Sequence, residues 1–253
     1  MVGTMLWIYL MMIRLSIYTV FKRYRLDWLQ KCIDALNNQT CKDFEYIFLV
    51  YGKDNDVIGI SNVLKTLTIP YKAYYEPDTE SFIPALKLAV DKCGADLILR
   101  ADAEDFLFPF AVERMLEFTE HQMIIPNYIP IDNDSNIIGN GVRGAVEDIS
   151  SNCIMHKALF NKIKFNQYQV CRDGYAIIRG MKELGIKPYY LDESMFYYRK
   201  HPGSITNNVR TNDIKKWNEM LVDNMYKYNL NTTELLIDKN DKFIITSERI
   251  IER

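Results

Sequence analysis

Across about the first 120 residues, hydrophobic positions alternate between a strand-like and a helix-like period. Apolar runs rich in β-branched and aromatic residues predict strands at 14–21, 44–50, 71–76 and 95–101. Apolar residues spaced for one face predict helices at 27–39, 81–94 and 109–120. Asp27 is a candidate N-cap for the first helix, Gly94 a stop for the second and Pro109 a start for the third. This alternation is typical of an α/β fold with a mostly parallel central sheet and helices on both faces.

The second half of the chain has a different pattern. Two apolar runs around a polar turn predict a hairpin at 123–142. Helical spacing recurs in three later segments, at 155–163, 172–185 and about 212–227. Short strands and a loop are expected at 187–206, and a closing hairpin at 233–250.

The start of the chain is apolar from Met5 to Ile13, but Arg14 follows. The run is far shorter than the roughly 20 residues of a membrane span, and it lacks the positive leader of a signal peptide. It is therefore an extra N-terminal strand, a segment upstream of a start at Met11 or Met12, or a surface that touches a membrane or a partner.

Composition narrows the function classes. Of 253 residues, 48% are hydrophobic and 25% charged, which is ordinary for a globular protein with a real core. The net charge of -2 argues against a nucleic-acid partner. The five cysteines are odd in number and form no Cys-x-x-Cys pair, which favours reduced thiols over disulfides or a zinc site. We expect a cytoplasmic protein, and peripheral contact with a membrane stays open.

Three acids follow the apolar run that ends near residue 101: Asp102, Glu104 and Asp105. Ligands of open parallel sheets bind beyond the carboxyl ends of the strands, which is where these acids fall. Like charges this close are costly unless a cation or a donor-rich ligand offsets them, and oxygen ligands without cysteine favour Mg²⁺ or Mn²⁺. Such a cation could neutralise a diphosphate. The alternative is an acidic loop that caps the next helix.

The segment "LILRADAEDFLFPFAVERM" (97–115) resembles the part of family 2, GT-A-fold glycosyltransferases that reads close to L-D-A-D-D-x-x-x-P-x-x-L. Residues 17–50 are similar to that family's opening strand, helix and second strand, and 172–206 to its closing motif. The resemblance covers about residues 14 to 206. It implies a GT-A (nucleotide-diphospho-sugar transferase) fold, divided as follows: a glycosyltransferase domain at 1–206, with a nucleotide-binding half at 12–120 and an acceptor half at 121–206, and a C-terminal helix and hairpin extension at 207–253.

The resemblance also implies an activity and a site. It implies a metal-dependent, inverting glycosyltransferase that moves a sugar from a nucleotide-diphosphate donor to a hydroxyl of a glycan, glycolipid or protein, with Mn²⁺ or Mg²⁺. Asp102 matches the first acid of the Asp-x-Asp motif, near the donor ribose and the metal. Glu104 matches the second acid, the usual metal ligand, and is one methylene longer. Asp105 matches an acid that supports the loop, Asp173 matches the general base, and His201 is a further candidate metal ligand.

Residues expected at the nucleotide follow from the same resemblance: Thr19, Phe21, Tyr51, Lys87, Asp102 and Arg199. The chain departs from the family where an Asp usually reads uracil, because Val50 stands there and cannot accept the N–H of the base. Tyr51 could stack on the base instead. Leu86 stands where the family has a habitual arginine, and Lys87 could substitute for it as a point charge. Arg172 takes the place of the acid before Asp173.

Two other function classes stay open. The departures at Glu104, Arg172, Val50 and Leu86 would also fit a catalytically silent GT-A-like module that binds a glycan or a partner protein. A sugar-phosphate nucleotidyltransferase would need a glycine-rich loop near the first strand, and residues 17–25 contain no glycine. Residues 139–152 are the expected acceptor lining. The acceptor itself, and whether the protein forms a homodimer, are open.

Overall fold

The computed structural model describes residues 13–23, 25–79, 81–144, 151–165, 173–202, 232–237 and 243–249. The chain divides into two compact units, Met1–Lys200 and His201–Arg253. In the second unit, β9 (Thr232–Ile237) and β10 (Phe243–Arg249) pair antiparallel, which confirms the predicted closing hairpin. The predicted helix at 212–227 and the apolar start at residues 1–12 lie outside the described residues. The predicted domain boundary after residue 206 stays a prediction.

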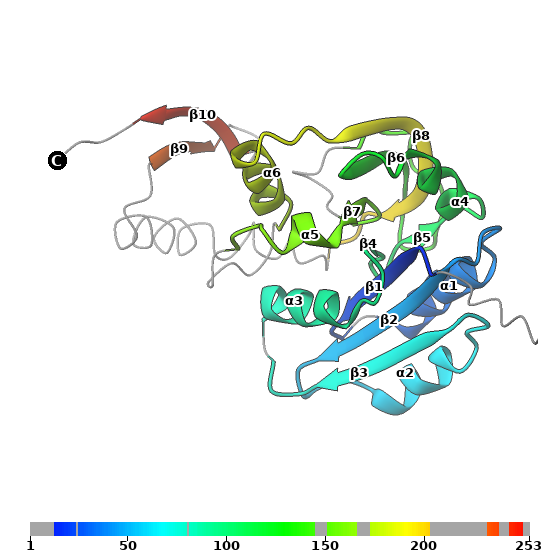
Figure 1. Ribbon diagram of the computed structural model, residues 1–253. Helices are drawn as coiled ribbons and strands as arrows, with labels where there is room; N and C mark the ends of the chain where they lie inside the picture. Colours follow the sequence, from blue (N-terminus) through cyan, green and yellow to red (C-terminus); the bar gives the residue numbers. More distant parts are fainter. Residues whose placement is uncertain are drawn as a thin grey trace, which may run out of the picture. The chain divides into compact units, whose positions relative to one another are not determined.

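The first unit is built on one mixed sheet with the strand order β3-β2-β1-β4-β7-β6-β8-β5 (Figure 1). Its first half holds the predicted strands, which are all parallel: β1 (Leu15–Phe21), β2 (Phe44–Tyr51), β3 (Tyr71–Glu76) and β4 (Leu97–Arg100). The helices between them are α1 (Leu26–Asn37), α2 (Val57–Leu64) and α3 (Phe82–Lys92). The predicted parallel, alternating half of the fold is confirmed.

The second half of the sheet mixes directions. Its strands are β5 (Phe106–Leu107), β6 (Met123–Ile131), β7 (Ile154–His156) and β8 (Tyr189–Arg199). β6 and β8 are parallel, β7 is antiparallel to β4 and β6, and β5 is antiparallel to β8. The helices here are α4 (Ala111–Met115), a 3₁₀ turn (Leu116–Phe118), α5 (Lys157–Phe160) and α6 (Asp173–Glu183).

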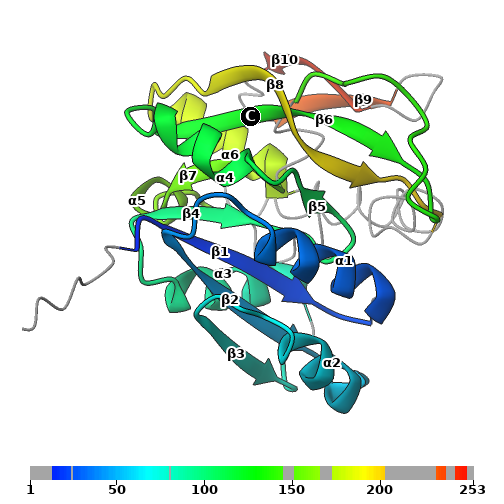
Figure 2. The same cartoon turned by 90° about the vertical axis from the view of Figure 1, so that its right-hand side faces the viewer.

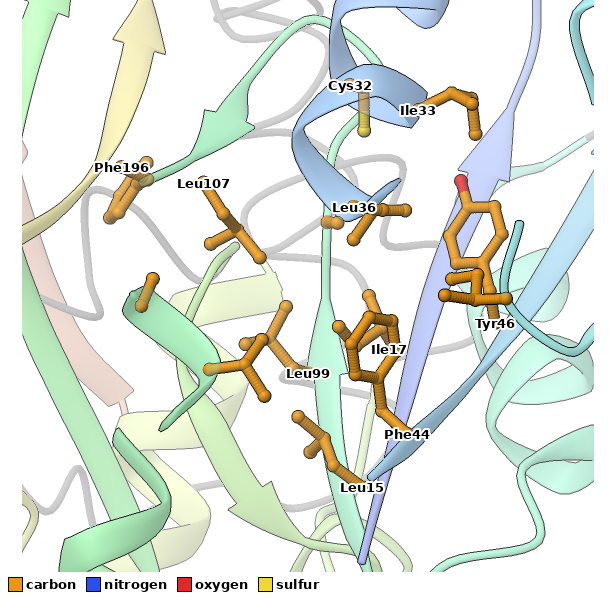
Figure 3. Packing of buried hydrophobic residues seen from close by; sticks show 14 of the residues in the cluster. Leu15, Ile17, Cys32, Ile33, Leu36, Phe44, Tyr46, Leu99, Leu107 and Phe196 are labelled. Carbon is orange, nitrogen blue, oxygen red and sulfur yellow. The ribbon is translucent and has the colours of Figure 1, made fainter. Parts of the chain in front are cut away.

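Alternate residues of the central strands enter two separate cores, one on each face of the sheet. On one face, side chains of β1, β2 and β4 pack against α1, α2 and α4; Figure 3 shows part of this core, with Leu15, Ile17, Phe44, Tyr46 and Leu99 from the strands and Cys32, Ile33 and Leu36 from α1. On the other face, the intervening residues pack against α3, α5 and α6. Figure 2 shows α1 and α3 on opposite sides of β1. Because both faces are covered, the strands read as continuous apolar runs.

Several local predictions were wrong. The residue before α1 is Arg25 rather than Asp27, and the Asp27 carboxylate pairs with the Arg25 guanidinium instead of capping the helix. Helix α2 was not predicted; it begins after Asp56, whose carboxylate accepts a hydrogen bond from the Gly59 N–H at 2.9 Å. In the segment 155–163, the first residues complete β7 and only Lys157–Phe160 are helical.

Other local features agree with the sequence or refine it. Gly185, the last residue of the predicted helix 172–185, has φ of +67°, a backbone conformation that favours glycine. The predicted hairpin at 123–142 is β6 followed by a return segment held by the isolated antiparallel bridges Tyr128–Val142 and Ile131–Ile137. Among the described residues, the helices are all too short or too polar to cross a bilayer.

Candidate functional site

The site is assembled where the parallel strands end. Phe21 closes β1, Tyr51 closes β2 and Arg100 closes β4, and the three strands point the same way. The Ala101 N–H donates to the Tyr18 carbonyl at 2.9 Å, so the chain is still held to β1 when it leaves β4. Asp102 and Glu104 therefore lie at the carboxyl edge of the sheet, as the sequence predicted.

Arg100 links two carboxylates that the sequence places far apart. Its Nε lies 2.9 Å from Oδ1 of Asp102, and its Nη1 donates to Oδ2 of Asp173 at 2.5 Å. Asp173 is the first residue of α6, where a carboxylate also meets the helix dipole favourably. The side chains of Arg100 and Asp173 are each 8% exposed, and that of Asp102 is 30% exposed. The predicted base and the predicted donor-site acid thus share one buried cation.

The acids of the cluster are electrostatically strained. Burial raises the pKa of Asp102, and the like charges of Glu104 and Asp173 raise it further, while the Arg100 guanidinium acts in the opposite direction. Burial of Arg100 lowers the pKa of its guanidinium, but the negative charges of Asp102 and Asp173 raise it by more. The net pKa of Arg100 is therefore raised. An added cation would relieve this repulsion.

Asp105 belongs to the core of the loop rather than to its surface. It is 1% exposed, and its carboxylate accepts from the Arg199 N–H at 2.9 Å and from Nδ2 of Asn152 at 3.3 Å. Burial, reinforced by Glu104 and Asp102, raises its pKa well above the usual range. These contacts tie the acidic loop to β8 and to the residues just before β7, in keeping with the supporting role that the resemblance implied.

Tyr51 lies near Asp102. Burial raises the pKa of its hydroxyl to about 12, and the charge of Asp102 adds to the shift. The Lys22 ammonium stands 5.1 Å from the centre of the Tyr51 ring. The ring is only 4% exposed, and its stacking on a nucleotide base stays a prediction.

The other residues predicted at the nucleotide have structural contacts of their own. The buried Thr19 hydroxyl donates to the Ala101 carbonyl at 2.5 Å and accepts from the Tyr46 hydroxyl at 2.7 Å. Phe21 is 1% exposed and its ring packs in the α1 core. Lys87 is exposed, with its amino group 5.5 Å from the centre of the Phe165 ring. Their contacts to a nucleotide stay predictions.

The guanidinium of Arg199 donates hydrogen bonds to oxygen atoms of the protein. Its Nε donates to the Glu104 carbonyl at 3.0 Å, its Nη1 to the carbonyls of Asp132 and Asn133 at 2.6 and 2.9 Å, and its Nη2 to the Ser135 hydroxyl at 2.9 Å. The side chain is 1% exposed. The guanidinium thus ties the acidic loop to residues 132–135, and its predicted contact with a diphosphate stays a prediction.

A divalent metal was predicted, and the described residues include no group of three or more His, Cys, Asp or Glu side chains able to hold one. Asp102 and Glu104 do supply two neighbouring carboxylates at a site with excess negative charge. Mg²⁺ commonly binds through one or two carboxylates, with waters and substrate phosphates as its other ligands. These two acids therefore fit a cation that arrives with a diphosphate. His201, the third predicted ligand, is half-buried and belongs to the second unit.

Arg100 is the functional residue that sequence reasoning missed. It ends an apolar strand and precedes the acids by two positions, and a charge inside such a run is rare unless it is paired. A charged residue in an apolar strand was therefore the sequence signal that could have identified Arg100. Its partner Asp173 could not have been inferred from spacing, because they are 73 positions apart.

Comparison with known proteins identifies what this arrangement is similar to. The family model described as glycosyl transferase family 2 matches residues 16–182. WbnJ of Escherichia coli, an O-antigen biosynthesis glycosyltransferase, is 32% identical over 115 residues, which are 44% of this chain and 39% of WbnJ. The chain therefore aligns with less than half the length of that relative.

Solved structures agree with the family match at the level of the fold. The crystal structure of S. aureus TarS, residues 1–349, superposes with a TM-score of 0.58 at 13% identity, over 74% of this chain and 60% of that one. The TarS structure in complex with UDP-GlcNAc gives a TM-score of 0.58 at 14% identity, over 76% and 60% of the two chains.

Proposed function

Because the chain belongs to glycosyltransferase family 2, with the GT-A fold that its sequence predicted, we propose that it moves a sugar from a nucleotide-diphosphate donor to an acceptor hydroxyl. The observation that carries the proposal is the meeting of Asp102 and Asp173 on Arg100 at the carboxyl edge of the sheet. Such an edge is where open α/β sheets bind nucleotides. The UDP-GlcNAc complex of the structural neighbour TarS supports a nucleotide sugar as the donor.

The proposed chemistry is a single displacement with inversion. The acceptor oxygen attacks the anomeric carbon while Asp173 takes its proton, and the bond to the diphosphate breaks with its electron pair on the leaving oxygen. Asp102 and Glu104 would hold Mg²⁺ or Mn²⁺ beside the diphosphate. When bound, that cation would supply charge stabilisation for the leaving nucleoside diphosphate.

The acceptor in this proposal is a hydroxyl of a glycan. The partial relative WbnJ, named for O-antigen biosynthesis, supports that substrate class. Residues 139–152 remain the proposed acceptor lining; of these, Gly139 and Gly141 pack closely on Pro130 and Ser194, where an added Cβ would lie 3.2 and 3.1 Å from those side chains. Cytoplasmic localisation with peripheral membrane contact, and a homodimer, remain proposals of the same kind.

The first test of this function is thermal stabilisation by UDP, GDP, CDP, ADP and dTDP, each with and without Mn²⁺ or Mg²⁺. A nucleotide at 100 times its Kd adds about 2.7 kcal/mol to the free energy of unfolding, which is roughly 5–10 °C for a chain of this size. We expect one nucleotide to act, and only with metal. Release of that nucleoside diphosphate from the matching donor sugar then measures turnover.

Two variants separate binding from chemistry. Asp102→Asn should abolish the metal-dependent shift, whereas Asp173→Asn should keep the shift and lose turnover. Asp96→Asn is the matched control, because Asp96 is exposed just before β4, at its opposite end. Metal-dependent binding without turnover in the wild type would point to the catalytically silent module, and the absence of any nucleotide shift would contradict the donor site.

A further inference from the structure

The guanidinium of Arg100 has no role in the displacement itself, yet it is a buried charge placed between two acids of the site. Its side chain is 8% exposed and pairs with one carboxylate on each side. Nη2 donates to Oδ2 of Asp102 at 3.4 Å, with Nε 2.9 Å from Oδ1 of the same residue, and Nη1 donates to Oδ2 of Asp173. We propose that Arg100 is a positioning residue, which holds the base Asp173 and the donor-site acid Asp102 at a fixed separation. This inference rests on the proposed function, because that proposal assigns the two acids their roles.

The two carboxylates come from different elements, and Arg100 is the direct link between them. Asp102 follows β4, whereas Asp173 is the first residue of α6, much later in the sequence. The planar guanidinium offers several donors in a rigid fork, so it can serve two acids at once with defined directions. A lysine carries a single compact charge and could favour either acid, but it would not fix their separation.

Packing keeps the fork in place. The guanidinium carbon lies 5.4 Å from the centre of the Phe82 ring, which belongs to α3. The Tyr18 side chain, which is buried on β1, is close enough that the Arg100 charge lowers the pKa of its hydroxyl against the larger effect of burial. Elements β1, β4, α3 and α6 therefore all converge on this one cation. A displacement of α6 would move the base away from the donor acid.

The consequence is a specific kinetic pattern. An acceptor hydroxyl must meet the base at a position set by the bound donor, and misplacement by about 1 Å can cost 100-fold in rate. Arg100→Met should therefore lower kcat by roughly 100-fold, with a much smaller change in the KM for the donor. Arg100→Lys should recover part of the lost kcat, because it restores the charge without the fork.

A double-mutant cycle separates positioning from folding. If Arg100 acts through Asp173, removing it from a protein that already lacks the base should change little, and the double variant Arg100→Met/Asp173→Asn should match Asp173→Asn alone within about twofold in kcat. A purely structural residue would instead give the product of the two losses. The double variant also removes one of the two carboxylates that lose the Arg100 guanidinium in Arg100→Met, so the cycle can still be measured if the single variant folds poorly.

The measurement uses the full chain, with kcat divided by the fraction of protein that binds nucleotide in a calorimetric titration. Arg114→Met is the matched control: Arg114 is on the surface, and it also pairs with two acids, Glu117 and Glu193. We expect this control to keep wild-type kcat. An active wild type whose Arg100→Met variant keeps its kcat, or a multiplicative cycle, overturns the inference alone. A wild type with no turnover on any donor overturns the proposed function, and this inference with it.

Discussion

Replacing Arg199 by methionine would test whether this buried guanidinium supports the loops or binds the donor. The side chain donates to three backbone carbonyls, those of Glu104, Asp132 and Asn133, and to the Ser135 hydroxyl. Its guanidinium carbon also lies 4.6 Å from the centre of the Trp28 ring. Methionine would fill much of the volume and remove every donor.

The expected loss follows from these contacts. A hydrogen bond that involves a charged group contributes about 1.5–3 kcal/mol, so four such bonds set an upper bound of roughly 6–12 kcal/mol. The four share one side chain and water can reach part of the loop, so their contributions do not add. We expect Arg199→Met to lower the free energy of unfolding by about 3–5 kcal/mol, comparable to breaking a buried ion pair. For a chain of this size, that is a fall in Tm of roughly 6–20 °C.

Urea unfolding and thermal melts measure the stability change, and nucleotide titration of the folded variant measures donor affinity. Arg179→Met is the control, since Arg179 is exposed and, among the described residues, donates one hydrogen bond, to the Lys164 carbonyl at 3.0 Å. A variant at Arg199 that keeps its Tm within about 2 °C, roughly 1 kcal/mol or less, but loses nucleotide affinity would refute the structural reasoning. It would instead support the diphosphate contact that the sequence predicted.

Two further predictions concern buried groups near the site. Because the folded pKa of Asp105 is raised by burial, the folded state binds that proton more tightly than the unfolded chain, so this stability is complete below about pH 4 and is lost as the pH rises through the folded pKa. The unfolding free energy of the wild type minus that of Asp105→Asn should therefore fall as the pH rises from about 4 in urea melts, and a rising difference would contradict the assignment. Thr19→Val should cost about 2–4 kcal/mol, because it leaves both the Tyr46 hydroxyl and the Ala101 carbonyl without a partner, whereas Tyr46→Phe keeps the Thr19 bond and should cost about 1 kcal/mol. Equal losses of unfolding free energy for Thr19→Val and Tyr46→Phe in chemical denaturation would show that the hydrogen bonds from Tyr46 to Thr19 and from Thr19 to Ala101 do not form a chain.

Much of the parallel half could be predicted because its signals are local. Strands β1, β2 and β4 are uninterrupted apolar runs, as expected when helices cover both faces of a sheet. Helix α2 escaped because Gly59 and several β-branched residues weaken its helical propensity, and its start depends on the cap provided by Asp56. The residues before α5 read as helical because the pairing of Met155 with β4 and β6 is a long-range contact.

The same holds for the candidate site: residues in local sequence motifs could be predicted, but contacts between distant parts of the chain could not. The resemblance located Asp102 and Asp173, and the structure places both on one cation. Arg199 was predicted at the diphosphate from its residue type and motif. Its observed contacts depend on the β6–β8 pairing, which brings residues 132–135 beside it. That pairing shifts register between Pro126 and Tyr128, and no periodic pattern in the sequence records such a shift.

The strand order also has a consequence for the kinetics of folding. β1 pairs with β2 across a separation of 29 positions, as at Ser16 and Glu45, but the Thr19 hydroxyl reaches the Ala101 carbonyl across 82 positions. Closing the longer loop costs about 1 kcal/mol more in chain entropy, and proteins rich in distant pairings fold more slowly. We therefore expect the acids that follow β4 to reach their places after β1, β2 and β3 have paired. A nucleotide that needs those acids should then bind only the folded chain, so we expect it to slow unfolding and to leave the folding rate unchanged.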